Sequence, residues 1–228
     1  GRVAPFSTSG APTVGCRLPL AHDLISSGRF DIVVIVEAAL DAGTARQAER
    51  FVRKQGDGVV AASAPTSHTV TKAVARSAAA DSASGGAAVH AGILMLLSES
   101  LAEGYTERPF HACSGRLLHV HTRPKDNTGD LHIVALYGVA SPSGDGVTIQ
   151  ADLARTLERL LSSLHGERVI VVGDINAVWH AMDRSRGQLH SYDTSEHALW
   201  RALQAAHYTD VHRLRHSSAR HFSYHHSN

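Results

Sequence analysis

The sequence of 228 residues is 43% hydrophobic, which is enough to build one large core and predicts a single domain. Its 22 basic and 21 acidic residues leave a formal net charge of +1, so no overall field draws the protein to nucleic acid, a membrane or an acidic substrate, and any such partner must be bound by a local patch. Two cysteines, Cys16 and Cys113, favour a reducing intracellular compartment, and the apolar stretches at 30–40 and 91–97 are too short or too interrupted by charge to span a bilayer.

The first half of the chain predicts helices and strands in close succession. Apolar residues at helical spacing end at Gly28, and the FDIVVIVE that follows is typical of a buried strand. Residues 61–88 are rich in Ala, Ser and Thr without a clear period, so we expect a mobile low-complexity insertion there. The expected elements are helices at 17–27 and 41–54, the second capped by Asp41, and strands at 30–37, 58–63 and 91–97.

The second half predicts a hairpin followed by a helical crossover. The turn-rich PKDNTG joins two apolar strands, at 116–122 and 131–137, which we expect to pair antiparallel. Hairpins combined with helical crossovers predict an α/β fold in which two packed sheets are covered by helices. The remaining expected elements are a leucine-faced helix at 150–165 ended by Gly166, a buried strand at 168–172, and a helix at 195–206 with Asp193 as cap and Glu196 three residues on.

Three of these strands end in residues that can carry chemistry. Asp174 and Asn176 of GDIN follow an apolar strand, where a carboxylate can position water or a hard cation and an amide can donate to a phosphate; the alternative is an Asx turn that bonds its own backbone. Glu37 suits Mg²⁺, which needs only one or two protein carboxylates, or is a solvated glutamate at a strand end. The phenol of Tyr137 can reach a phosphate oxygen, or the ring belongs to the core with its hydroxyl in water.

The order of these segments resembles the endonuclease/exonuclease/phosphatase superfamily, and especially the endonuclease domains of non-LTR retrotransposons. That branch typically reads DIVxLQE, GGVAIL, VYAP, GDFN, an Asp-Arg pair and LxDxxR. The corresponding segments here are DIVVIVE, AGILML, LYGVASP, GDIN, Asp183 with Arg184, and YTDVHRLRH followed by HFSYHH. Ordered matches across residues 3–228 are far more specific than any one motif, and they imply a DNase I-like, four-layer α/β sandwich.

The resemblance also implies roles for individual residues. Glu37 would be the metal ligand, Tyr137 a phosphate contact, Asp174 the residue that orients or activates water, and Asn176 a phosphate or transition-state donor. The implied reaction is hydrolysis of DNA phosphodiester bonds assisted by Mg²⁺, or by Mn²⁺ in its place. We expect the four side chains to face one crevice, and the protein to act on DNA in the nucleus without a membrane partner.

Further positions carry over by the same resemblance. Ser7, Arg184 and Arg213 are candidate nucleic-acid contacts, while Asp210 and Arg213 also match positions that are structural in the retroelement branch. Two residues depart from the family pattern: Ser7 stands where the first strand of the family ends in Asn, and Val36 replaces the Gln before the metal glutamate.

The family also ends in an acidic strand and Ser-Asp-His, which this chain does not reach, so we expect a domain that is incomplete at its C-terminus and cut from a longer protein. We expect it to nick DNA very weakly or not at all until that segment is added. These departures leave an alternative, a catalytically inactive derivative that binds nucleic acid or protein. A third class is a small-molecule phosphatase or phospholipase on the same fold.

Two other features of the sequence could carry chemistry. His119 and His121 lie on one strand face at an interval that metals use, yet the sequence suggests no third ligand, which favours an exposed hairpin face over a zinc enzyme. Residues 212–228 combine His, Arg and two aromatic residues without an acid, and are either a phosphate-binding segment or a solvated tail. Serine hydrolase, Walker A and zincin motifs are absent from the sequence.

Overall fold

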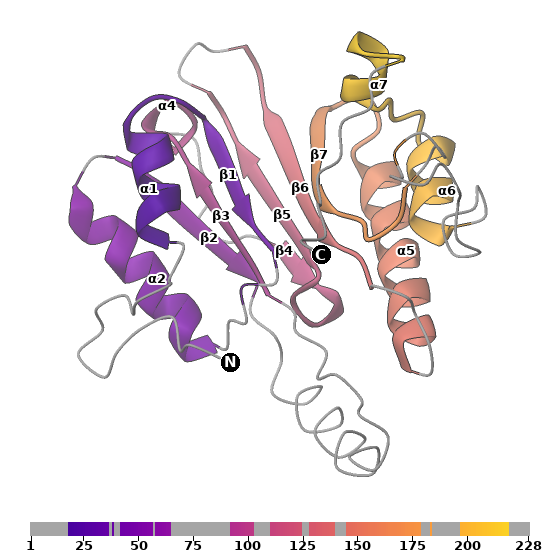
Figure 1. Cartoon of the computed structure of the whole chain (residues 1–228), viewed down its shortest axis with the longest axis horizontal. Coiled ribbons are helices and arrows are strands. Elements are labelled where there is room, and N and C mark those ends of the chain that lie inside the picture. The colour runs from indigo at the N-terminus through magenta and orange to yellow at the C-terminus, as the bar shows by residue number, and fades with distance from the viewer. Residues whose placement is uncertain are drawn as a thin grey trace, which may run out of the picture. The chain divides into compact units, whose positions relative to one another are not determined.

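The computed structural model describes residues 18–36, 38, 42–56, 58–64, 92–102, 110–124, 128–139, 145–178, 183 and 197–218. The chain divides into two compact units, one made of Gly1–Tyr137 and Gly166–Asp174, the other of Gly138–His165 and Ile175–Asn228. Every strand of the described segments belongs to the first unit (Figure 1). The expectation of a single domain stays a prediction.

The strands of the first unit form two sheets. One has the order β1-β3-β2 and is antiparallel throughout; the other has the order β4-β5-β6-β7, antiparallel except for the parallel pair β6–β7. The strands are β1 Ile32–Ile35, β2 Val60–Ala64, β3 Ile93–Leu97, β4 Phe110–Ala112, β5 Leu117–Thr122, β6 Leu131–Tyr137 and β7 Arg168–Asp174. The helices of this unit are α1 Leu18–Ser26, α2 Ala42–Gln55, α4 Glu99–Ala102 and the 3₁₀ helix η1 Cys113–Gly115.

Strand β3 is buried on both faces and so separates two hydrophobic cores. Leu94 and Leu96 point to the core formed with α1 and α2, whereas Ile93, Met95 and Leu97 point to the core shared with β5 and β6. This explains why AGILMLL has no polar alternation. The first unit is therefore layered as helices, three-stranded sheet and four-stranded sheet, and each fully buried Leu or Ile contributes roughly 1.5–3 kcal/mol.

The second unit contains α5 Asp145–Ser163, α6 Ala198–Ala205 and α7 Val211–Arg215. Helices α5 and α6 pack against each other, and the predicted leucine face of α5 is buried at Leu153, Leu157 and Leu161. Buried Gln150 of α5 ties this unit together, because its Oε1 accepts from the backbone N–H of Val139 at 3.0 Å and its Nε2 lies 3.1 Å from Nε2 of His197.

Several sequence expectations need correction. The strand expected to be buried at 168–172 is β7, where Ile170 and Val172 are 44% and 37% exposed, because β6 is its only neighbour among the described strands. β1 is half-buried. Helix α6 begins at Ala198 with His197 as N-cap and no capping side chain, so the predicted Asp193 cap is wrong. Residues 61–64 of the predicted insertion belong to β2, and its remainder lies outside the described residues. The sequence did not predict α4, β4, η1 or α7.

No described helix is long and apolar enough to cross a membrane.

Candidate functional site

Tyr137 and Asp174 end the two parallel strands of the second sheet side by side. Tyr137 of β6 is the register partner of Asp174 of β7. Register partners in a parallel pair point to the same face of the sheet. Tyr137 is 8% exposed and belongs to the core between the sheets, whereas Asp174 is exposed at the end of its strand. The first unit therefore brings a phenol and a carboxylate together at the carboxyl ends of two strands.

Close approach of the two strands explains the glycine before Asp174. Gly173 has φ +144°, and a Cβ built on it would overlap the carbonyl oxygen of Leu136 on β6. Any larger residue would push β7 away from β6 just before Asp174. Gly173 therefore has a packing reason that does not depend on chemistry.

In the second unit, Asn176 is held by a long-range hydrogen bond. Its backbone is left-handed, with φ +57°, and its Nδ2 donates to the carbonyl oxygen of Gly138 at 3.0 Å. This bond is made by the amide nitrogen, so it does not decide about an Asx turn, which uses the side-chain oxygen. Gly138 has no room for a side chain, because a Cβ would overlap the carbonyl oxygen of Ile175. Asn176 thus fixes the loop that follows β6, and its role as a phosphate donor stays a prediction.

Arg116 is a functional candidate that the sequence reasoning missed. It precedes β5 and is only 3% exposed, with Nη1 donating to the carbonyl oxygen of Tyr137 at 3.1 Å and Cζ lying 4.7 Å from the centroid of the Tyr137 ring. The predicted hairpin could have indicated this contact, because antiparallel pairing of 116–122 with 131–137 places Arg116 opposite Tyr137.

Glu37, Ser7 and Arg184 lie outside the described residues, so their predicted roles stay predictions. The backbone that follows β1 is placed by Ala38, whose N–H donates to the carbonyl of Gly92 at 3.0 Å, while the N–H of Gly92 donates to the carbonyl of Gly115 at 3.2 Å. These bonds set Ala38 at the same end of the two sheets as Tyr137.

Arg213 is engaged inside the second unit. Its Nη2 pairs with Oδ1 of Asp183, and the two side chains are 11% and 21% exposed. Its Nη1 donates to the carbonyl oxygens of His216 and Ser217, at 3.2 and 3.4 Å, and its backbone N–H caps α7 by donating to Oδ1 of Asp210 at 3.0 Å. These contacts favour the structural role over the nucleic-acid contact, which stays a prediction.

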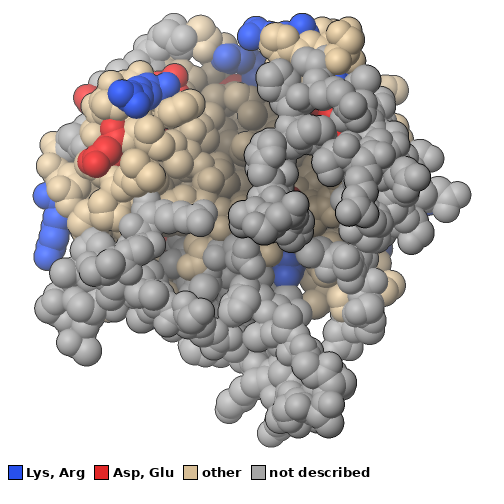
Figure 2. Space-filling view, in the orientation of Figure 1, with Lys and Arg blue, Asp and Glu red and all other residues tan. Residues whose placement is uncertain are grey.

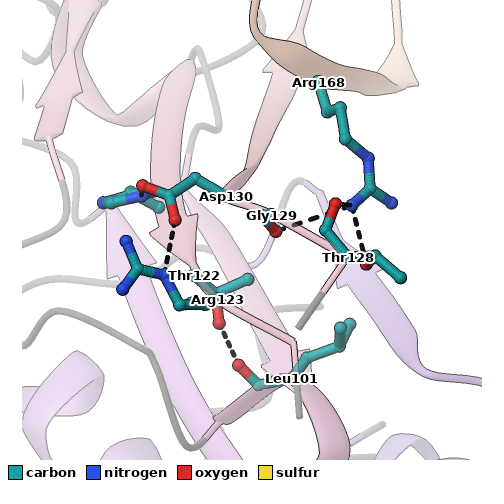
Figure 3. Close-up of polar contacts among 8 residues, drawn as sticks. Leu101, Thr122, Arg123, Thr128, Gly129, Asp130 and Arg168 are labelled. Carbon is teal, nitrogen blue, oxygen red and sulfur yellow. Dashed lines mark hydrogen bonds and ion pairs between the residues drawn. The ribbon is translucent and has the colours of Figure 1, made fainter. Parts of the chain in front are cut away.

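His119 and His121 stack with a third histidine, His132 of β6. Nε2 of His119 lies 3.0 Å from Nδ1 of His132, and the rings of His121 and His132 stack with centroids 4.6 Å apart. Burial, and after it the charges of His132 and His121, lower the pKa of His119 to about 4. The pKa of Asp130 is lowered by hydrogen bonds from Arg123, at 2.6 Å, and from His121 (Figure 3).

The face shown in Figure 2 has no continuous basic patch in its described portion, and the described residues form no cluster of metal ligands. Lys and Arg side chains on the face shown in Figure 2 are scattered among acidic and neutral residues and form no continuous basic patch in its described portion. Within the described ranges, no group of three or more His, Cys, Asp or Glu side chains could hold a metal ion, and this includes the three stacked histidines.

No protein-family model and no curated protein sequence matches this chain. Its fold is nevertheless shared by solved structures. A 3′-5′ exonuclease, NExo from Neisseria meningitidis, has a TM-score of 0.59 and 14% identity, covering 90% of this chain and 72% of its own. The AP endonuclease LMAP from Leishmania major has a TM-score of 0.54 and 12% identity, covering 85% of this chain and 60% of its own. A NExo variant from Neisseria, described as a 3′ phosphatase and bound to a product DNA hairpin, has a TM-score of 0.52 and 13% identity, covering 85% and 67%. The chain therefore has the DNase I-like α/β fold of these nucleases, as the resemblance in its sequence implied.

Proposed function

We propose that this chain is an endonuclease-like domain of the retroelement type that hydrolyses DNA phosphodiester bonds with a divalent metal ion. The observation that carries the proposal is the register pairing of Tyr137 with Asp174 at the carboxyl ends of β6 and β7. Loops and strand ends at such an edge are where α/β folds hold their ligands. The solved structures with this fold include an exonuclease and an AP endonuclease, and one of them holds a DNA product.

The residues of this edge fit phosphodiester hydrolysis. The exposed carboxylate of Asp174 can orient water and accept its proton, and the phenol of Tyr137 can donate to a phosphoryl oxygen.

Mg²⁺ suits this chemistry of oxygen donors, and Glu37, by resemblance, would hold it with water completing the coordination. When bound, the ion would stabilise charge on the phosphoryl oxygens and on the leaving oxygen.

One observation favours a second candidate, an inactive derivative that binds DNA or protein. Val36 stands where the family has the polar Gln before its metal ligand, and here Val36 packs against the core between the sheets. A hydrophobic side chain cannot hydrogen-bond a metal-bound water or carboxylate, and loss of such a partner typically costs about 10–100-fold in metal affinity or activity.

Nicking of supercoiled plasmid during a Mg²⁺ titration separates these candidates. The informative variant is Asp174→Asn, and the matched control is Asp152→Asn, which makes the same chemical change at an exposed carboxylate of α5. Mg²⁺-dependent nicking that is lost in Asp174→Asn and kept in the control supports the endonuclease. DNA binding without cleavage, both in this chain and in one extended through a terminal Ser-Asp-His, supports the inactive derivative. Release of phosphate from inositol or lipid substrates without nicking would contradict both.

A further inference from the structure

The Arg116 side chain contacts both the backbone and the ring of Tyr137. The guanidinium donates to the Tyr137 carbonyl at 3.1 Å and lies over the ring at 4.7 Å, within the range of a cation–π contact. The backbone N–H of Tyr137 donates to the carbonyl of Arg116 at 2.9 Å, which continues the hairpin pairing by one residue. Arg116, Tyr137 and Asp174 therefore stand in one row across the ends of β5, β6 and β7.

A buried arginine at this position needs partners that compensate for its loss of water. Taking a guanidinium out of water is costly, and an apolar residue of similar volume is often neutral or stabilising in such a place. Arg116 is 3% exposed, so its side chain is withdrawn from solvent. At least two of its side-chain contacts are to Tyr137, the residue that ends β6.

We propose that Arg116 is a positioning residue that fixes the ring of Tyr137 beside Asp174 for phosphodiester cleavage. This inference rests on the proposed function of Tyr137 as a phosphate contact. A tyrosine that is contacted on its ring face and at its backbone carbonyl can adopt fewer side-chain orientations. Its phenol is therefore held near the position it needs for phosphate contact before the substrate binds. Preorganisation of this kind matters because a displacement of about 1 Å can cost on the order of a hundredfold in rate.

Tyrosine NMR tests the clamp without relying on activity. In protein labelled with ¹³C at the tyrosine ring carbon that bears the hydroxyl, Tyr137→Phe identifies the Tyr137 signal among those of the five tyrosines. We expect Arg116→Met to move that signal and to leave the others in place. The matched control is Arg168→Met, which removes an arginine from the opposite end of the same sheet, where it bonds Thr128 (Figure 3). An unmoved Tyr137 signal in Arg116→Met overturns the proposal.

Cleavage kinetics test the consequence by a double-mutant cycle. Arg116→Met should lower kcat about ten- to a hundredfold with KM nearly unchanged. It should cause no further loss in the Tyr137→Phe background, because it acts through the hydroxyl that Phe lacks. Losses that multiply would overturn the proposal. If Arg116→Met does not fold, Arg116→Lys, which keeps the charge but loses the planar stack, gives the deciding NMR signal. If neither this chain nor the chain extended through a terminal Ser-Asp-His cleaves DNA, the proposed function fails, while the NMR result still decides whether Arg116 positions Tyr137.

Discussion

Replacing His119 with Phe should make folding less sensitive to mild acid. His119 is half-buried on β5, its Nε2 lies 3.0 Å from Nδ1 of His132, and the two rings stack with centroids 5.2 Å apart. Burial is the main cause that lowers the pKa of His119 from 6.5 to about 4, followed by the charges of His132 and His121. The groups around this stack also include Asp130, Arg123 and Glu167, of which Asp130 and Glu167 favour protonation of His132.

The sign and size of the effect follow from linkage. Because the pKa of His119 is lower in the folded protein than in the unfolded chain, the unfolded chain binds more protons, and stability is lost as pH falls from about 6.5 to about 4. The difference between 6.5 and about 4 corresponds to roughly 3 kcal/mol at about 1.36 kcal/mol per pH unit. Solvent screening of a partly exposed ring reduces the expected loss to roughly 1–2 kcal/mol.

Urea denaturation of His119→Phe and of the unaltered protein, at about pH 7.5 and about pH 4.5, measures this contribution. The variant should lose roughly 1–2 kcal/mol less free energy of unfolding between the two pH values. His165→Phe, at an exposed position just after α5, is the control and should behave like the unaltered protein. Equal losses in all three proteins, or a His119 ring that titrates near 6.5 by NMR, would refute the reasoning.

Three further changes should alter stability in ways that the structure distinguishes. Gly173→Ala should cost more than about 2 kcal/mol because its Cβ overlaps β6, and clearly more than Gly129→Ala, which also has a positive φ but has open space around it; urea denaturation compares them. Asn176→Gly keeps the left-handed backbone and should lose about 1 kcal/mol, the worth of its hydrogen bond, and a loss near zero would show that the bond does not form. Arg213→Met should lower the free energy of unfolding by about 1–3 kcal/mol, because it leaves the partly buried Asp183 without its cation; unchanged thermal unfolding would contradict this.

The sequence predicted the strands and the hairpin of the candidate site because their signals are local. LHIVALY and RLLHVHT are apolar strands around a turn, and their pairing fixes where Tyr137 ends. Position after an apolar strand likewise indicated that Asp174 ends β7. Contacts between residues far apart in the sequence could not be predicted from these local patterns. The third histidine of the stack, His132, comes from the opposite strand, and Arg116 looked like an ordinary strand residue until its contacts with Tyr137 were known.

The exposure of β7 could not be predicted for a related reason. An apolar run such as RVIVV indicates a strand but not which strands pair with it, so it does not distinguish a central strand from an edge. Ile170 and Val172 are exposed because β7 has only β6 beside it among the described strands, and the apolar run does not reveal how many neighbours its strand has.

Three residues of GDIN occupy their positions for different structural reasons. These reasons decide which substitution tests the chemistry without changing the fold. Gly173 is required by the approach of β6, and Asn176 by the carbonyl of Gly138, so replacing either changes the fold of the strand end as well as any reaction there. Asp174 is exposed and in register with Tyr137, where a change from Asp to Asn keeps shape and removes charge. Surface substitutions of this kind usually change stability by less than about 0.5 kcal/mol, whereas removal of a group that stabilises a transition state costs on the order of a hundredfold or more in rate. Asp174→Asn is therefore the variant in which activity and folding separate most cleanly, and a large loss of stability in it would mean that this carboxylate serves the fold instead.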